Sequence, residues 1–546
     1  MRQFVRLWIA CAGVIYGLTA CSLGESNPQI VYITATPQMV QVMPATPMIA
    51  TALPSEPTST NIPTQSVFVP TVVLSVVPMT LEITQTPNPS RFDLPPTGMQ
   101  QHIVEAGDTL SKIAEKYGTT LESLIDENQL VNPDILTIGQ IIKLPELPTE
   151  FTPSLKLLPD SRLVRASNAF DVAKFITNQP GFLKGVTDEV DFRQFDGSTI
   201  KKTLTAAQVV EQISVEYSVD PRLLLALLEY RAGWLSNPTP NEIQKNFPLI
   251  FSLETNRLGL YRQLSWAAYH LNAGYYGWKQ RALTTLEFES GERFLYDVGL
   301  NAGTVALQYF FSVKSDMTSW HNAISTPQGF FSVYYAYFGN PFDDKDPLVP
   351  SDLIQPDLGL PFGSGEVWFF TGGAHGGWAS SSAWSALDFA PPDERTDGLF
   401  CFVSEYWVRA VADGVIARSQ DGGVWLDLDG DGDDSTGWVI FYLHIATQDR
   451  ASVGTVVKKG DPIGLASCEG GYSTATHLHI ARKYNGEWIP TDCQLCASHD
   501  ARPVFNLGGW EVVSIPNQEY QGYLDFNGQR LTAEQGRVSV INRISW

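Results

Sequence analysis

The sequence predicts a multidomain protein in which a small βααβ module, a mainly α-helical region and an all-β antiparallel domain follow one another. Three observations support this fold class. The 546 residues exceed what one hydrophobic core usually holds and indicate three or four domains. Apolar residues recur at helical spacing in residues 206–313. Further along, Gly423–Leu428 and Trp438–His444 are strand-like and flank a short acidic turn, as expected of a β-hairpin.

The first 21 residues predict export. Met1–Arg6 is basic and Leu7–Leu18 is apolar, and this apolar run is shorter than a membrane-spanning helix needs. Small residues then precede Cys21, in a pattern that resembles a bacterial lipobox. The resemblance implies cleavage before Cys21 and lipidation of this cysteine, which would hold the protein on the outer face of a membrane in the bacterial cell envelope. The alternative is an ordinary signal peptide with an incidental cysteine.

Residues 22–99 are predicted to be a linker. From Val31 to Gly98, Thr, Pro, Val and Met dominate, and only Glu56, Glu82, Arg91 and Asp93 carry a charge. The spaced prolines disfavour helix and favour an extended chain. The valine runs could instead form strands, although no turn residues organise them into a sheet.

Composition limits the partners of the protein. The apolar fraction of 44% is that of a globular protein, while the net charge of −22 and a pI near 4.7 argue against partners that attract cations, such as nucleic acid and anionic membrane surfaces. We therefore expect a monomer that contacts a membrane only through its lipid anchor and binds no nucleic acid.

Residues 100–147 predict a compact module of two short strands and two helices. Its landmarks resemble those of the LysM family: Gly107–Leu110, Ile113-Ala114, Asn128 and Gly139-Gln140. The resemblance implies that the module binds N-acetylglucosamine chains of peptidoglycan in a groove formed by Gly107, Asp108, Thr109, Asn132 and Ile135. A simple helix-capping role for Asp108 is compatible with this prediction.

Residues 155–345 predict a mainly helical domain, with Ala206–Tyr217 and Asp220–Trp234 as its clearest helices. The second of these resembles, over a short stretch, the entry to a lysozyme-like transglycosylase domain. Where that family has its catalytic acid, this chain has Arg231, which cannot donate a proton at neutral pH. We therefore expect a degenerate domain that binds glycan or acts as a spacer. The alternatives are a second hydrolase that uses Glu229 and a helical domain unrelated to lysozyme.

Four of the eight histidines form a pattern with one aspartate: His375, Asp388, His444, His477 and His479. In an extended strand, His477 and His479 face the same side. Two imidazoles and one carboxylate can hold zinc and leave a fourth position for water, as in catalytic zinc sites. The remaining histidines can then handle protons while a carbonyl group is attacked.

The segments around these residues resemble the M23 family of zinc-dependent peptidoglycan endopeptidases, and they are Gly372–Ala390, Phe441–His444 and Ser473–His479. The long gap between the first histidine and the aspartate is similar to the beta-lytic and LasA-type branch. The resemblance implies an antiparallel β-domain over residues 355–500. It also implies Zn²⁺ ligands at His375, Asp388 and His479, and a catalytic pair at His444 and His477.

The acidic turn in this domain matches the start of a calcium-binding loop. It supplies carboxylates at Asp427, Asp429, Asp431 and Asp433. However, Trp438 stands at the twelfth position, where a bidentate Glu is expected. The loop could bind Ca²⁺ weakly or be a solvated acidic turn, and the sequence leaves both alternatives open.

Four cysteines lie in or near the same domain: Cys401, Cys468, Cys493 and Cys496. An even number in an exported protein predicts two disulfides. We expect Cys401 with Cys468 and Cys493 with Cys496, although four cysteines allow three pairings. A structural zinc half-site at the last two is the competing prediction.

Residues 501–546 are expected to add strands that pack on the β-domain. Together these features predict a cell-surface zinc endopeptidase that a LysM module holds on peptidoglycan, where it cleaves peptide stems or cross-bridges. The alternative is a non-catalytic peptidoglycan-binding scaffold or an activator of other wall hydrolases.

Overall fold

The computed structural model describes residues 101–545 except 106, 107, 118, 120, 131, 134, 145–147, 149, 250–256, 326, 327, 344–347, 494–501, 516, 517, 538 and 539. The predicted signal sequence with Cys21, the linker, and Gly107 of the predicted glycan groove lie outside the described residues. Within the described part, no helix has the length and apolar character needed to cross a membrane.

The N-terminal module has the predicted βααβ order. Asn128 fastens its second helix to its second strand, because the Asn128 amide donates to Lys143 O and its Oδ1 accepts from Lys143 N, at 2.8 and 2.7 Å. Its elements are β1 (Gln101–Ile103), α1 (Leu110–Lys116), α2 (Leu121–Asn128) and β2 (Ile141–Lys143), and the two strands pair antiparallel. One apolar cluster fills the interior: Val104, Leu110, Ile113, Ala114, Tyr117, Leu124, Ile142 and Leu144.

The middle region contains the predicted long helices and several shorter ones. Its described helices are α3 (Asp160–Leu163), α4 (Val172–Thr177), α5 (Ala206–Tyr217), α6 (Pro221–Ala232), α7 (Glu242–Asn246), α8 (Leu260–Lys279), α9 (Ala302–Ser312), α10 (Met317–Ile324) and α11 (Phe330–Phe338). Two 3-10 turns are also present, η1 (Phe182–Gly185) and η3 (Pro341–Asp343).

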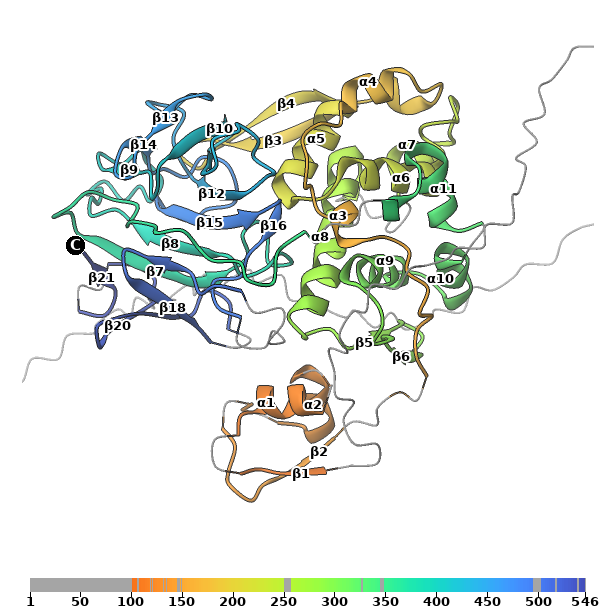
Figure 1. Cartoon of the computed structure of the whole chain (residues 1–546), viewed down its shortest axis with the longest axis horizontal. Coiled ribbons are helices and arrows are strands. Elements are labelled where there is room, and N and C mark those ends of the chain that lie inside the picture. The colour runs from red at the N-terminus through yellow and green to blue at the C-terminus, as the bar shows by residue number, and fades with distance from the viewer. Residues whose placement is uncertain are drawn as a thin grey trace, which may run out of the picture. The chain divides into compact units, whose positions relative to one another are not determined.

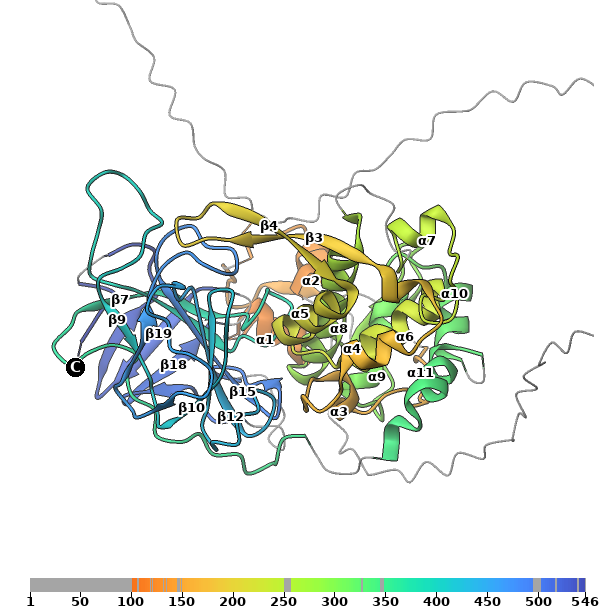
Figure 2. The ribbon, with the colours of Figure 1, turned by 90° about the horizontal axis from the view of Figure 1, so that it is seen from above.

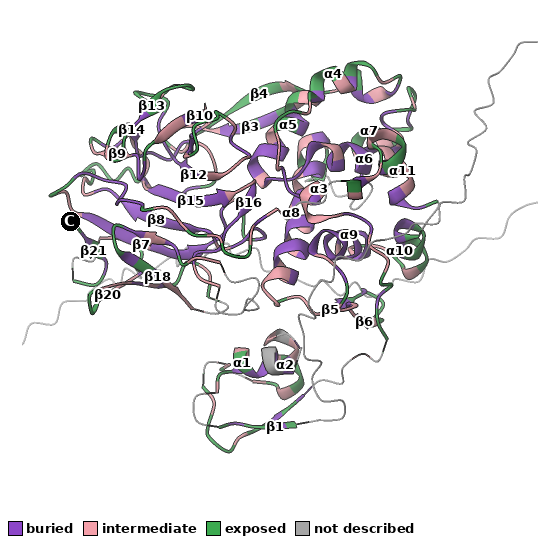
Figure 3. Cartoon of the chain, in the orientation of Figure 1, coloured by how far each residue is buried: buried purple, intermediate pink, exposed green. Residues whose placement is uncertain are grey.

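Two β-hairpins make this region a mixture of helices and strands, so the prediction of a mainly helical domain is not confirmed. The hairpins are β3 (Thr187–Arg193) with β4 (Thr199–Thr205), and β5 (Thr285–Glu287) with β6 (Arg293–Leu295). Nearly all side chains of β4 are exposed, as the green ribbon in Figure 3 shows. A strand without a buried face lacks the alternation of apolar residues that predicts strands from sequence.

The β-domain is built on one nine-stranded antiparallel sheet with the order β13-β10-β11-β12-β15-β8-β7-β21 and with β16 paired to β15. The bounds are β7 (Trp368–His375), β8 (Ala386–Ala390), β10 (Gly414–Gln420), β11 (Gly423–Asp427), β12 (Trp438–Leu443), β13 (Val456–Val457), β15 (Leu478–Tyr484), β16 (Glu487–Trp488) and β21 (Arg543–Ile544). A separate pair is formed by β9 (Trp407–Arg409) and β14 (Pro462–Leu465).

Both faces of the central strands are buried, which Figure 3 shows in purple for β8 and β15. Alternate residues of a strand point to opposite faces of the sheet. In β12, Val439 and Phe441 join the apolar core shared with the helices, while Ile440 and Tyr442 join the core inside the β-domain. The sheet therefore lies between two cores, and its central strands have little freedom to shift.

The C-terminal segment adds strands to this domain. A four-stranded sheet contains β17 (Asn506–Leu507), β18 (Trp510–Ser514), β19 (Gly522–Phe526) and β20 (Gln529–Thr532). Trp510 and Leu524 of this sheet are buried in the core of the β-domain, and β21 pairs with β7 through Ile544 and Trp368. The chain end thus covers one edge of the main sheet.

The middle region and the β-domain share an apolar core. Trp425, Phe441 and Trp488 of the β-domain belong to the same buried cluster as the side chains of α5, α8 and α9. In Figures 1 and 2 the β3–β4 hairpin extends from α5 toward the β-domain, where Arg193 forms a backbone bridge with Gly470.

Buried ion pairs cross the same boundary. Arg165 of the middle region pairs with Asp434 of the β-domain at 3.1 Å, and only 5% and 3% of the two side chains is exposed. Arg418 also contacts Asp434, at 2.9 Å. Burial alone would raise the pKa of Asp434, but Arg165 and Arg418 hold it well below its usual value. The carboxylate is therefore a fixed charge, which both arginines stabilise.

Arg165→Met should destabilise the protein, because it leaves the buried Asp434 carboxylate with one cation fewer. Loss of one partner of a buried pair usually costs about 3–5 kcal/mol, and since Arg418 remains we expect about 2 kcal/mol. Urea unfolding of the full chain, followed by tryptophan fluorescence, measures the change. Lys201→Met is the matched control, since Lys201 and its partner Glu189 are both 65% exposed and such pairs contribute about 0–1 kcal/mol. Equal unfolding midpoints for Arg165→Met and the unaltered protein would contradict the expectation.

Candidate metal centre

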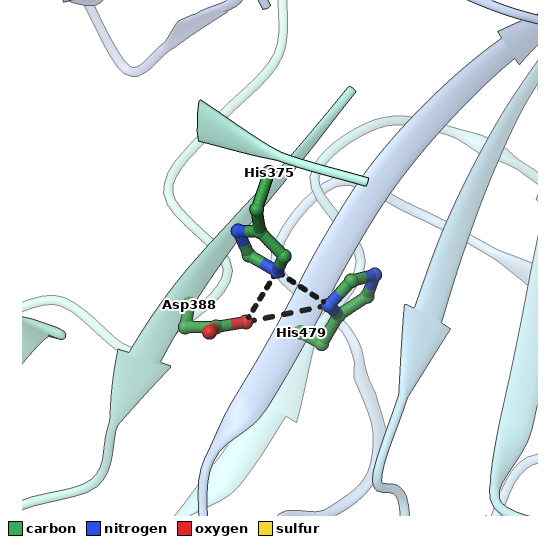
Figure 4. Close-up of side chains that lie close together, drawn as sticks. All are labelled: His375, Asp388 and His479. Atoms are coloured by element: carbon green, nitrogen blue, oxygen red, sulfur yellow. Dashed lines mark hydrogen bonds and ion pairs between the residues drawn. The ribbon is translucent and has the colours of Figure 1, made fainter. Parts of the chain in front are cut away.

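Three neighbouring strands bring the predicted metal ligands together. His375 ends β7, Asp388 lies at the centre of β8, and His479 is the second residue of β15. The pairing of β8 with β15 places His479 directly opposite Asp388. A glycine is required beside them, because a Cβ at Gly372 would lie 2.5 Å from Asp388 Oδ2. Figure 4 shows the three side chains pointing toward one another.

The tautomers of the two histidines follow from their backbone partners. His375 Nδ1 lies 2.7 Å from Gly373 O, and His479 Nε2 lies 3.1 Å from Gly377 O. A carbonyl oxygen only accepts, so these ring nitrogens carry the protons. The other two nitrogens, His375 Nε2 and His479 Nδ1, are 3.0 Å apart, and in the neutral form of both rings each presents a lone pair. Two lone pairs that converge in this way repel each other unless a cation lies between them.

The carboxylate completes a set that suits zinc. Asp388 Oδ1 lies 3.2 Å from His375 Nε2 and 3.3 Å from His479 Nδ1. This oxygen is buried and has no hydrogen bond of acceptable geometry among the described residues. Burial alone would raise the pKa of Asp388, but His375 and His477 hold it well below its usual value, so it stays an anion. Two imidazole nitrogens and one carboxylate oxygen are a usual ligand set of catalytic zinc.

His444 stands beside the ligand cluster in an unusual backbone conformation. It directly follows β12 and has φ of 66°, a left-handed conformation that bulky residues seldom adopt without tertiary support. Its Nδ1 donates to Glu469 O at 3.0 Å. Burial, reinforced by His477 and His479, holds the pKa of His444 well below its usual value. The ring is therefore neutral at neutral pH.

His477 completes the predicted group of five residues, although it precedes β15 and is not a regular strand residue. Its ring centroid lies 4.5 Å from that of His444, and its Nε2 lies 3.6 Å from Asp388 Oδ1. Its Nδ1 lies 2.8 Å from Ala475 O. The five residues named from the sequence thus lie together. Three of them are on β7, β8 and β15, while His444 directly follows β12 and His477 directly precedes β15.

The loop that holds His444 depends on Glu469, which the sequence did not single out. The buried Glu469 carboxylate accepts from Thr447 N at 2.7 Å and from Arg450 Nη1 at 3.1 Å. The disulfide between Cys401 and Cys468 fastens the same loop one residue earlier. Cys493 is described but its predicted partner Cys496 lies outside the described residues, so that pairing stays a prediction.

The C-terminal segment supports the first metal ligand, a role for which the sequence gave no sign. The Tyr520 ring stacks on the His375 ring, with centroids 4.3 Å apart and planes inclined by 21°. Its backbone N–H donates to Ala374 O at 3.0 Å, and Glu519 accepts from Gly376 N at 3.2 Å. Contacts of this kind fix ligand orientation. They join residues about 145 positions apart in the sequence, which no local pattern records.

The predicted calcium loop forms the tip between β11 and β12. Asp427, Asp429 and Asp431 each place a carboxylate oxygen within 4.8 Å of the others. The loop also uses these oxygens internally, since Asp427 accepts from Gly432 N at 2.8 Å. Asp433 accepts from Ser435 N at 2.9 Å. Calcium binding stays a prediction, because an acidic turn whose carboxylates accept hydrogen bonds from its own backbone would have the same conformation without an ion.

The middle region offers no free carboxylic acid at the place suggested by the lysozyme-like resemblance. Glu229 accepts hydrogen bonds from Leu235 N at 2.8 Å, from the backbone and hydroxyl of Ser236, and from Tyr337. The guanidinium of Arg231 lies 5.2 Å from the Phe311 ring centroid. Glu229 therefore fixes the turn after α6, which is a structural role.

The described residues of the predicted glycan groove lie in two loops of the N-terminal module. The Asp108 carboxylate accepts a hydrogen bond from Glu105 N and lies 2.8 Å from His102 Nε2. The cap of α1 is provided by Thr109, whose hydroxyl accepts a hydrogen bond from Lys112 N. Asn132 O accepts from Ile135 N at 3.5 Å, and 66% of the Ile135 side chain is exposed. Glycan binding by these residues stays a prediction.

Comparisons with known proteins assign the middle region and the N-terminal module. Residues 156–350 match the family model described as LasA, N-terminal domain, and residues 102–145 match that of the LysM domain. Protease LasA of Pseudomonas aeruginosa is 26% identical over 306 residues, which cover 52% of this chain and 67% of that protein. The chain is a LasA-like protein with a LysM domain. The resemblance read from the sequence is thereby confirmed, whereas the lysozyme-like resemblance gains no support from the match at residues 156–350.

Other similarities are more local. The cortical fragment-lytic enzyme of Bacillus subtilis is 47% identical over 47 residues, which cover 9% of this chain and 11% of that enzyme. Among solved structures, the M23 metalloprotease pseudoalterin from the deep sea is 23% identical and covers 33% of this chain and 96% of its own, with a TM-score of 0.26.

Zinc content should depend on the three converging side chains. After exhaustive dialysis we expect one zinc ion for each full-length chain, and an at least tenfold lower content in His479→Ala and in Asp388→Asn, because each change removes a ligand atom. Plasma mass spectrometry gives the stoichiometry. His321→Ala, which alters an exposed histidine of α10, should keep the full content. If the unaltered protein contains no zinc after the cells are grown with zinc, the proposed site is refuted.

Proposed function

We propose that the chain is a zinc-dependent endopeptidase that cleaves peptide bonds of peptidoglycan. The observation that carries the proposal is the position of His444 and His477, whose rings lie 4.5 Å apart beside the three converging ligands. Three side chains that can bind one metal ion, with two further histidines beside them, are the groups that hydrolysis of a peptide bond requires. The similarity to Protease LasA supports a peptidase.

The roles of the two histidines follow from their fixed Nδ1 atoms. His444 Nδ1 donates to Glu469 O and His477 Nδ1 lies against Ala475 O, so each ring has its Nε2 for proton transfer. Zinc, when bound by the cluster, would polarise the scissile carbonyl and acidify water. The neutral His444 is suited to accept a proton. His477, whose Nε2 lies 3.6 Å from Asp388 Oδ1, would place a second imidazole beside the negative charge that develops on the carbonyl oxygen.

The LysM domain supports peptidoglycan as the substrate, since it would keep the catalytic domain close to glycan strands and raise the local substrate concentration. We further propose that the protein lies in the bacterial cell envelope, outside the membrane, with a lipid on Cys21 and residues 22–99 as the tether. This part of the proposal rests on the sequence motifs alone.

Clearing of purified peptidoglycan should require the cluster and the histidine pair. We expect His479→Ala and His477→Ala to lower the clearing rate at least about 100-fold, because one removes a ligand and the other a proton carrier. Turbidity gives the rate, and labelling of products should show new amino groups without new reducing sugar ends. Equal clearing by all three proteins would contradict the proposal. Binding of peptidoglycan without clearing by the unaltered protein would instead favour the non-catalytic scaffold.

A further inference from the structure

A cavity of about 350 Å³ lies where the middle region meets the β-domain. Phe192, Glu216 and Tyr261 line it from the middle region, and Trp378, Trp425 and Tyr472 line it from the β-domain. Neither part alone would enclose this space. Its size is within the usual range of about 300–1,000 Å³ for small-molecule sites, and a few polar groups among aromatic walls are typical of such sites.

The cavity adjoins the candidate metal centre. Leu443, which lines it, directly precedes His444. Gly471 also lines it, and a Cβ built there would lie 4.0 Å from His444 Cε1 and 3.8 Å from the Trp378 ring. Gly377, whose carbonyl fixes the His479 tautomer, directly precedes Trp378. A molecule bound in the cavity would therefore lie within reach of His444.

The cavity contains a buried carboxyl group that lacks a counter-charge. Glu216 is 8% exposed, and it accepts from Gln212 Nε2 at 2.7 Å and from the Tyr261 hydroxyl at 2.9 Å. Both donors are neutral, and none of the described residues forms an ion pair with Glu216. Burial raises the pKa of Glu216 to about 7 in spite of these two hydrogen bonds. Among the residues that line the cavity the one cation is Arg193, whose guanidinium lies 5.5 Å from the centroid of the Tyr472 ring and forms no ion pair with Glu216. An ammonium group placed against Glu216 would therefore supply its counter-charge.

Two residues that line the cavity also contact a primary ammonium group of this chain, that of Lys202. Lys202 Nζ lies 4.1 Å from the centroid of the Phe192 ring and 2.8 Å from Asp421 Oδ1. Both Phe192 and Asp421 line the cavity. An ammonium group between an aromatic face and a carboxylate is a favourable arrangement, because both the ring face and the carboxylate attract positive charge. Lys202 thus places an ammonium group against two lining residues, whereas none of the described residues places one against Glu216.

We propose that this cavity is a substrate subsite that binds a primary ammonium group of the peptide, with Glu216 as its counter-charge and the ring of Trp378 against its aliphatic part. The inference rests on the proposed function and narrows its substrate to peptides with a free amine near the cleaved bond. A lysine-type side chain and a free peptide N-terminus share this chemistry. The middle region thereby becomes part of the substrate site.

The test compares three forms of one lysine-containing stem peptide: unmodified, acetylated on the lysine amine, and acetylated on the N-terminal amine. Binding to the full chain, kept from cleaving by a chelator, is measured by fluorescence anisotropy with a label at the peptide C-terminus. We expect one of the two acetylated forms to bind at least about tenfold more weakly than the unmodified peptide. The form that is weakened identifies which amine enters the cavity. Equal binding of all three peptides would overturn the inference, and this comparison requires no variant to fold.

Variants then assign the effect to the cavity. Glu216→Gln should abolish the preference for the free amine, because an amide keeps hydrogen-bonding capacity but carries no charge. Glu211→Gln is the matched control, since Glu211 lies on the same helix, α5, and is exposed. A preference that survives Glu216→Gln would overturn the inference.

Cleavage of the same peptides with zinc restored separates the two proposals. A binding preference without any cleavage would leave the subsite standing and remove the proposed peptidase function. Cleavage at equal rates with equal binding would leave the peptidase function standing and remove the subsite.

Discussion

The pairing register of β15 is the constraint on which the candidate metal centre depends. This strand lies between β8 and β12, and His479 is paired with Asp388 on one side and with Leu443 on the other. One register therefore sets the metal ligands opposite each other and places His444, which follows Leu443, beside them. A slip by one residue would turn His479 to the other face of the sheet and would separate both groups. The two apolar cores that cover the sheet make such a slip costly.

Around this rigid centre, loops from distant parts of the chain set the orientation of single rings. Glu469 fixes His444 through its backbone carbonyl, and Tyr520 stacks on His375. The middle region adds a wall to the same neighbourhood through Phe192 and Glu216. Buried ion pairs such as Arg165 with Asp434 also join the two parts, so the region that matches the LasA N-terminal domain packs directly against the domain that holds the candidate metal centre.

The five residues of the centre could be named from the sequence because each lies in a short segment with a recognisable neighbourhood, such as the HxH of His477 and His479. The LysM module could be predicted for the same reason. Tyr520, Glu469 and the aromatic cavity could not, since their importance arises from contacts between distant segments. The β3–β4 hairpin was missed because β4 has no buried face and β3 buries only Val190 and Phe192 at alternate positions, although the hairpin backbone reaches Gly470, next to Glu469.

The most direct test of the central claim is an anomalous difference map at the zinc absorption edge from crystals of the full chain. We predict one peak, about 2.0–2.2 Å from His375 Nε2, from a carboxylate oxygen of Asp388 and from His479 Nδ1, with His444 and His477 outside ligand distance. A map without a peak among these three atoms, from protein prepared with zinc, would contradict it. So would a peak ligated by His444 or His477 in place of one of the three.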